Sequence, residues 1–159
     1  MASCRLCGQP GLVPMLELGA HPIAHRLLTD PKQEEYVHPV DVRFCEGCGL
    51  LQLVDPVPPA ELYTEYNWLT SWKNAPHLPR LVELVEQLQG LDERSSIVEV
   101  GSNDGTFLAL LRDRGYRDLL GIEPAKDARQ NARQKGVRTL GSYFSLETAA
   151  ALLSQQGKC

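Results

Sequence analysis

Two pairs of cysteines have the spacing that binds a metal ion. The pairs are Cys4 with Cys7 and Cys45 with Cys48, and residues 8–44 lie between them. Four thiolates can surround one Zn²⁺ ion tetrahedrally, each sulfur about 2.3 Å from the metal. Four protein ligands leave no open position for a substrate. The sequence therefore predicts a structural zinc site.

A glycine follows the second cysteine of each pair, Gly8 in the first and Gly49 in the second. A tight turn around a metal-bound sulfur needs a left-handed residue, which glycine adopts at little cost. The alternative is four free or redox-active cysteines. A redox CxxC pair opens a helix of a thioredoxin-like unit, and neither pair lies in such a pattern, so the zinc site is favoured.

Other candidate metal ligands are weaker. His21 and His25 are four residues apart, but Pro22 between them argues against a regular helix that presents both rings. We expect these histidines to serve in packing or at the surface. Cys159 has no partner at a metal-binding spacing, so we expect a free thiol.

A glycine-containing turn follows an apolar run over 97–100 and opens a helix. A dinucleotide-binding turn has the form G-x-G-x-x-G, so that the backbone can approach a pyrophosphate. Here the third motif position is Asn103, and Asp104 would repel a phosphate, more strongly in a cleft of low dielectric. This disfavours a nicotinamide oxidoreductase. An ordinary turn in which Asn103 or Asp104 caps the helix is an open alternative.

S-adenosylmethionine reverses the electrostatic argument, because it carries a sulfonium and an ammonium and no phosphate. Glu99 and Asp104 would then face positive charge, while Gly101 and Gly105 would let the cofactor approach the backbone. Glu123 follows the next apolar run, where a carboxylate can accept hydrogen bonds from both ribose hydroxyls. The turn therefore favours a cationic ligand.

Helices and strands alternate in the second half of the chain. We predict strands over 96–100, 119–123 and 137–140, and helices over 78–88, 105–114, 125–135 and 146–155. This alternation is typical of an α/β fold with a parallel sheet. The predicted fold class is a small Cys4 zinc-binding domain followed by the first part of a Rossmann-like domain.

Three zones are predicted along the chain. Residues 1–55 form the zinc-binding domain, with short strands over 12–18 and 50–54, and residues 77–159 form the Rossmann-like part. Residues 56–76 form a proline-containing connector. The connector carries an aromatic cluster of Tyr63, Tyr66, Trp68 and Trp72.

Composition restricts the class of protein. The chain has 159 residues, 43% of them hydrophobic and 23% charged, with a net charge of −4. These values are typical of a soluble globular protein, and the lack of a basic block argues against a nucleic-acid partner. No apolar window is long enough to span a membrane and no signal peptide opens the chain. We therefore expect a cytoplasmic protein without a membrane partner.

The order of the motifs resembles that of the sugar C-methyltransferase family. The resemblance covers essentially the whole chain, although His25 stands where the family pattern would have asparagine. The residues that carry it are Cys4 and Cys7, Leu18–Gly19, Cys45 and Cys48 before Leu51-Gln52-Leu53, Leu62-Tyr63 with Tyr66, VEVGSNDGTFL and GIEPA.

The resemblance implies an S-adenosylmethionine-dependent enzyme that removes a proton beside the keto group of a deoxysugar nucleotide and methylates the resulting enolate. It makes Tyr66 the first candidate catalytic residue and Tyr63 the second, although both tyrosines could instead pack in the aromatic cluster. It also implies that the cofactor site is lined by Gly101, Ser102, Asn103, Asp104, Gly105 and Glu123.

Members of this family are several hundred residues longer, so the resemblance implies a truncated chain, inactive by itself. The strand over 97–100 would then lie at the edge of its sheet, with unpaired backbone groups that could promote self-association. A different class of function is also open: a zinc-containing interaction or scaffold module without catalysis.

Overall fold

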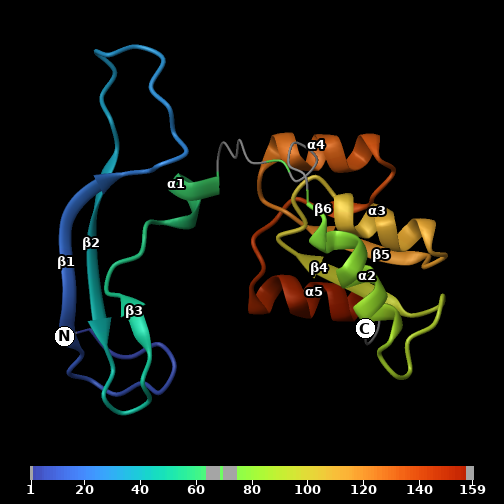
Figure 1. The fold of residues 1–159 in the computed structure, drawn as a ribbon, viewed down its shortest axis with the longest axis horizontal. Helices are drawn as coiled ribbons and strands as arrows, with labels where there is room; N and C mark the ends of the chain where they lie inside the picture. The colour runs from blue at the N-terminus through green and yellow to red at the C-terminus, as the bar shows by residue number, and fades with distance from the viewer. Residues whose placement is uncertain (1, 64–68, 70–74, 157–159) are drawn as a thin grey trace. The chain divides into compact units, whose positions relative to one another are not determined.

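The computed structural model describes residues 2–63, 69 and 75–156, and the statements below concern these residues. The chain divides into two compact units, Met1–Leu62 and Tyr63–Cys159. Figure 1 shows an antiparallel sheet in the first unit and alternating helices and strands in the second.

The first unit is built on a three-stranded antiparallel sheet in the order β1-β2-β3. Its strands are β1 (Val13–Pro22), β2 (Val37–Phe44) and β3 (Leu51–Leu53), and the short helix α1 (Pro59–Tyr63) follows. Strands β1 and β3 correspond to the strands predicted over 12–18 and 50–54, whereas β2 was not predicted. The signal was present, because Val42 and Phe44 alternate with Asp41 and Arg43, the pattern of a strand with two different faces.

The second unit is α/β, as the sequence predicts. Its three strands are parallel and lie in the order β4-β5-β6. The predicted elements are all present, with bounds that differ from the prediction by at most two residues. They are α2 (His77–Glu86), β4 (Ser96–Val100), α3 (Thr106–Asp113), β5 (Asp118–Ile122), α4 (Lys126–Gln134), β6 (Thr139–Leu140) and α5 (Leu146–Gln156).

In the described part of the chain, β4 pairs with β5 and lies at the edge of the sheet. This confirms the predicted edge position. Pairing runs in register from Ser96 with Asp118 to Val100 with Ile122. The carboxyl ends of β4 and β5 therefore lie side by side, where ligands bind in open parallel sheets. Self-association through the β4 edge stays a prediction.

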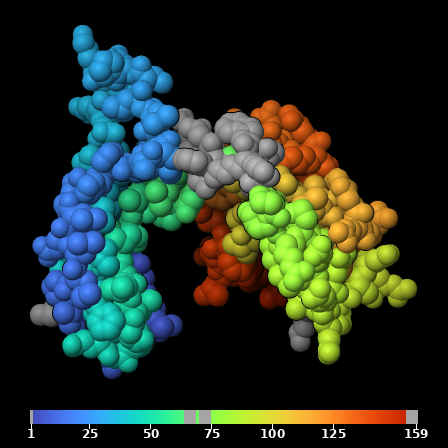
Figure 2. Space-filling model, in the orientation of Figure 1, coloured from blue at the N-terminus to red at the C-terminus, as the bar shows by residue number. Residues whose placement is uncertain are grey.

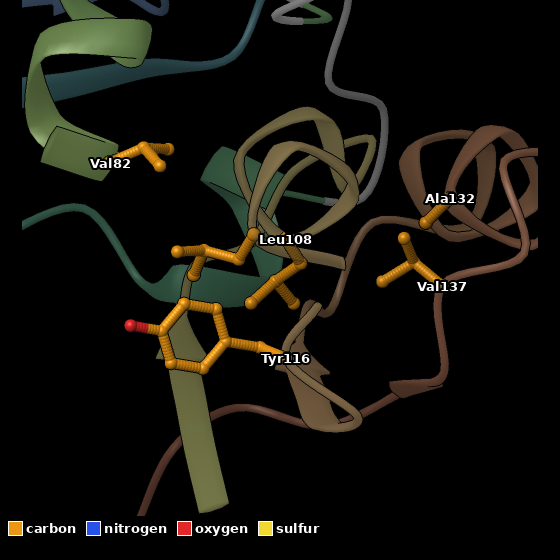
Figure 3. Close-up of a cluster of buried hydrophobic side chains, with 6 residues drawn as sticks. Val82, Leu108, Tyr116, Ala132 and Val137 are labelled. Carbon is orange, nitrogen blue, oxygen red and sulfur yellow. The ribbon is translucent and has the colours of Figure 1, made fainter. Parts of the chain in front are cut away.

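The core of the second unit joins α2, α3 and α4 to the sheet. Leu108 and Leu111 of α3 are fully buried, and Val82 of α2 packs in the same cluster. Figure 3 shows Leu108 directed toward the ring of Tyr116, and Val137 beside Ala132. Helix α2 packs against α3, and the two lie next to each other on the face seen in Figure 2. Such a core fixes the turns that connect its elements.

Among the described residues, no helix combines the length and the apolar character needed to cross a lipid bilayer.

Gly121 in the middle of β5 is required by close packing under the glycine turn. A Cβ atom at this position would lie 2.3 Å from Ser102 Oγ and 2.8 Å from Ser102 Cβ. Both atoms belong to a buried residue, so they cannot move away freely. We expect Gly121→Ala to lower the free energy of unfolding by about 1–3 kcal/mol, measured by urea denaturation. The double variant Gly121→Ala/Ser102→Gly removes both clashing atoms and should recover most of this loss, whereas equal instability of both variants would contradict the packing argument.

Candidate zinc centre and cofactor site

The four predicted zinc ligands meet in one cluster in the first unit. The sulfur atoms of Cys4, Cys7, Cys45 and Cys48 all lie within 4.8 Å of one another. The Cys4–Cys48 and Cys7–Cys45 sulfur distances are both 3.6 Å. A tetrahedral ion at about 2.3 Å from each ligand requires sulfurs roughly 3.8 Å apart. The residues present therefore fit a zinc ion with little rearrangement.

Two turns of matching geometry hold these sulfurs. The N–H of Gly8 donates to the carbonyl of Cys4 at 2.9 Å, and the N–H of Gly49 donates to the carbonyl of Cys45 at 2.8 Å. Gly8 has φ 75° and Gly49 has φ 78°, which is the left-handed conformation that the sequence predicts for both glycines. Local sequence thus shapes each half of the site.

The negative charge of the cysteine thiolates favours the binding of a cation in this cluster. The backbone N–H of Cys7 lowers the pKa of Cys4 to about 6, so that this sulfur is a thiolate near neutral pH. At Cys48 the N–H of Leu50 favours the thiolate, but burial and the three other cysteines raise its pKa to about 12. Four thiolates therefore cannot coexist here unless a metal ion compensates their charge.

The other sequence candidates for metal binding lie apart from this cluster. Within the described residues, the nearest partner of His21 Nε2 is the Leu18 carbonyl at 2.9 Å, and His25 Nε2 lies 2.8 Å from the Leu62 carbonyl. Both histidines thus contact backbone; His21 is exposed and His25 is partly buried. Cys159 lies outside the described residues.

The glycine turn joins the end of β4 to the start of α3. Gly101, Asn103 and Gly105 have φ values of 72°, 51° and 70°. Three left-handed residues in five positions make a turn tight enough to bring the ends of β4 and α3 together, and glycine lowers the strain at two of them. Asn103 offsets its own strain locally, because its side-chain oxygen accepts the N–H of Asp104 at 2.7 Å.

The backbone of this turn has no free donors. Each N–H from residue 101 to residue 106 donates to an acceptor in the protein. The Ile122 carbonyl accepts from Gly101 and Ser102, and a carboxylate oxygen of Glu123 accepts from Asn103 at 2.9 Å. A phosphate bound at such a turn depends on free N–H groups. The turn is therefore unsuited to a pyrophosphate, whatever the charge of Asp104.

Glu123 is buried at the end of β5, with 6% of its surface exposed. Its second oxygen accepts the N–H of Ala125 at 2.8 Å, at the start of α4. The same carboxylate thus fixes the glycine turn and the first residues of α4. Each carboxylate oxygen has a further lone pair, so Glu123 can also accept hydrogen bonds from a ligand.

Asp104 is the most enclosed acid of the site, with 0% of its surface exposed. One of its oxygens accepts the hydroxyl of Thr106 at 2.6 Å, and the other lies 2.9 Å from the ammonium of Lys135. Asp104 also accepts the N–H of Thr106, the first residue of α3, at 3.3 Å. The N-cap position itself is held by Gly105 without a side-chain hydrogen bond, so neither Asn103 nor Asp104 is the N-cap residue. The structure places this predicted cofactor residue against a lysine of the protein itself.

Glu99 differs from the two other acids. Its Oε2 atom is buried and has no hydrogen-bond partner among the residues that the structure describes, and the same holds for the hydroxyl of Ser102. Glu99 pairs in register with Gly121, whose missing side chain would point at Ser102, so both orphaned groups project from the same face of the sheet. Burial, then the charges of Asp104 and Glu123, raise the pKa of Glu99 from 4.5 to about 7. A donor or cation placed there would satisfy an oxygen that the protein leaves unpaired.

A cavity of about 290 Å³ opens beside the turn. Tyr63, the second catalytic candidate, is 39% exposed, and its ring centroid lies 6.4 Å from that of Tyr143. Tyr66 lies outside the described residues, as do Trp68 and Trp72. The cavity is lined by Tyr63, Val100, Gly101, Asn103, Ile122, Glu123, Pro124, Ser142, Tyr143 and Phe144.

Sequence reasoning missed several residues of this site. Thr106 and Lys135 hold Asp104, while Tyr143 and Phe144 form an aromatic wall of the cavity. The position of Tyr143 and Phe144 directly after the predicted third strand was an available signal, because ligands bind at the carboxyl ends of parallel strands. The sequence held no such signal for Lys135.

Comparison with known proteins finds similarity to a zinc-binding domain family and to a C-methyltransferase. Residues 4–63 match the family described as "Putative zinc binding domain". Over 158 residues, the chain is 31% identical to the C-methyltransferase NovU of Streptomyces niveus. The match covers 97% of this chain and 37% of that relative, so the chain spans well under half of its length. Residues 4–63 are thus similar to this family of zinc-binding domains, and the chain is similar to a C-methyltransferase over nearly its whole length.

Proposed function

We propose that this chain is the zinc- and cofactor-binding part of an S-adenosylmethionine-dependent C-methyltransferase. In this proposal the glycine turn and Glu123 bind the cofactor, and the zinc ion has a structural role. The observation that carries the proposal is the absence of free N–H donors between residues 101 and 106, together with an orphaned acid, Glu99, at the same turn. That combination favours a cationic ligand over a phosphate-bearing one.

The cavity supports the same assignment. Its lining includes Glu123 and the aromatic residues Tyr143 and Phe144. A carboxylate can accept ribose hydroxyls, and aromatic rings can stack on an adenine base. When bound, S-adenosylmethionine supplies an electrophilic methyl group. The chain's own residues would bind and orient it.

The proposal also concerns the substrate that accepts the methyl group. The similarity to NovU supports a carbon atom as the methyl acceptor, and the motif resemblance favours a keto-deoxysugar nucleotide. Tyr66 and Tyr63 remain the proposed catalytic candidates. For Tyr63, this role is supported by its position in the lining of the cavity beside the turn.

Calorimetry on the 159-residue chain tests the cofactor assignment. We expect S-adenosylmethionine and S-adenosylhomocysteine to bind, and NAD⁺ to give no heat. Because a nearby ammonium favours the ionised form of Glu99, its pKa should fall from about 7 on binding. The affinity should then rise about tenfold per pH unit below pH 7 and level off above it.

Two further measurements sharpen this test. In buffers of different ionisation enthalpy, binding at pH 6 should show the release of a proton. The variant Glu99→Gln should bind more weakly and lose the pH dependence. Tight binding of NAD⁺ would overturn the proposal. If none of the three ligands gave a binding heat, the zinc-containing scaffold module without catalysis would be favoured instead.

A further inference from the structure

The end of helix α4 lies unusually close to the glycine turn. A Cβ atom on Gly105 would lie 3.1 Å from the Cβ atoms of both Ala132 and Val137. Ala132 and Val137 belong to the buried core of the unit. The residue before Gly105, Asp104, is 0% exposed.

A carboxylate buried to this degree is strongly destabilising unless a cation and hydrogen bonds compensate it. The compensating cation is Lys135, the residue that ends α4. Its ammonium lies 2.9 Å from Asp104 Oδ2 and donates to the hydroxyl of Thr106 at 2.7 Å. That hydroxyl in turn donates to Asp104 Oδ1 at 2.6 Å. The three groups form a closed network between the turn, the start of α3 and the end of α4.

The network affects how many of the carboxylates around the turn remain available to a ligand. Three carboxylates surround the turn: Glu99 from β4, Asp104 in the turn itself, and Glu123 after β5. Within the described part of the chain, the ion pair that involves one of these carboxylates joins Lys135 to Asp104. Arg129 is close to Glu123, but it donates to backbone carbonyls. The charge of Asp104 is thus compensated inside the protein, whereas Glu99 keeps an unpaired oxygen.

We infer that Lys135 is a positioning residue of the cofactor site: it holds Asp104 ionised and within the protein, so that Glu99 and Glu123 are the acids left to meet the ligand. The cofactor part of this inference rests on the proposed function. The pairing itself does not, because it can be measured without any ligand.

The first test measures stability against pH for four proteins: the wild type, Lys135→Met, Lys135→Arg and the double variant Lys135→Met/Asp104→Asn. Without its cation, buried Asp104 favours the protonated form. Lys135→Met should therefore lose stability as the pH rises from 5.5 to 8, by roughly 30-fold in the folding equilibrium constant at pH 8 relative to the wild type.

The other two variants separate charge from packing. Lys135→Arg keeps the cation and should restore the wild-type pH profile. The double variant has no titrating group at position 104, so its loss of stability should not depend on pH. A pH-independent loss in Lys135→Met, unchanged by Asp104→Asn, would mean that Lys135 acts only through packing and would overturn the inference.

The second test measures the affinity for S-adenosylhomocysteine under conditions where each variant is folded. Lys135→Met should bind about tenfold more weakly at pH 8 than the wild type, with recovery in Lys135→Arg. Wild-type affinity in a folded Lys135→Met at pH 8 would contradict the positioning role. Failure of the wild type itself to bind would contradict the proposed function, and the stability profiles would still decide the pairing.

Discussion

Replacing Cys45 by serine should release the zinc ion and unfold the first unit. Cys45 is buried at 3% exposure and packs with Cys4 and Leu12 in the small cluster that forms the core of this unit. Its carbonyl also accepts the N–H of Gly49, so the side chain and the turn are fixed together. A hydroxyl is a poor ligand for zinc in place of a thiolate. Structural zinc sites contribute on the order of 10 kcal/mol to folding, which is more than so small a core can replace.

The measurement is zinc content by atomic emission, together with amide hydrogen exchange. In Cys45→Ser we expect less than one zinc ion per chain and rapid exchange over β1, β2 and β3, whereas the exchange of β5 should change little. Cys159→Ser is the matched control, because it removes a thiol from the same chain and should leave zinc content unchanged. A Cys45→Ser protein that keeps a full zinc ion would show that the cluster is not the metal site.

Replacing Glu123 by glutamine should abolish most of the cofactor affinity. The two oxygens of Glu123 accept the backbone N–H groups of Asn103 and Ala125. A glutamine side chain has one oxygen and one NH₂ group, so one of these N–H groups would face another donor in a buried site. The mismatch should lower the free energy of unfolding by about 1–3 kcal/mol. We also expect a loss of about 100-fold in affinity for S-adenosylhomocysteine, because the ribose would lose its acceptor and the turn its support.

Calorimetry gives the affinity and urea denaturation gives the stability of the same protein. Glu147→Gln provides the control, because Glu147 is exposed in the first turn of α5 and undergoes the same chemical change. The control should retain both quantities. If a stable Glu123→Gln protein bound S-adenosylhomocysteine with an affinity within threefold of the wild type, Glu123 would not be part of the cofactor site.

Parts of this protein could be predicted from short stretches of sequence. The two CxxC pairs with their glycines fix the local turns, so the zinc centre follows from local geometry and chemistry. The order of elements in the second unit follows from periodicity, because apolar residues repeat differently in helices and strands. Strand β2 has a period of two as well, so its alternating residues also carried a local signal.

The role of each acid was decided by the tertiary structure. From the sequence, Glu99 and Asp104 look alike, two carboxylates beside one glycine turn. Packing of α4 against Gly105 encloses Asp104 and brings Lys135 to it, while Glu99 remains without a partner for one oxygen.

The sequence by itself determined the zinc ligands, the α/β architecture and the position of the turn, because these depend on residues close together in the chain. Only the tertiary structure decided which carboxylate the protein neutralises and which N–H groups it uses up. The physical reason is that burial and charge pairing depend on which distant segments pack together, and local spacing does not contain that information.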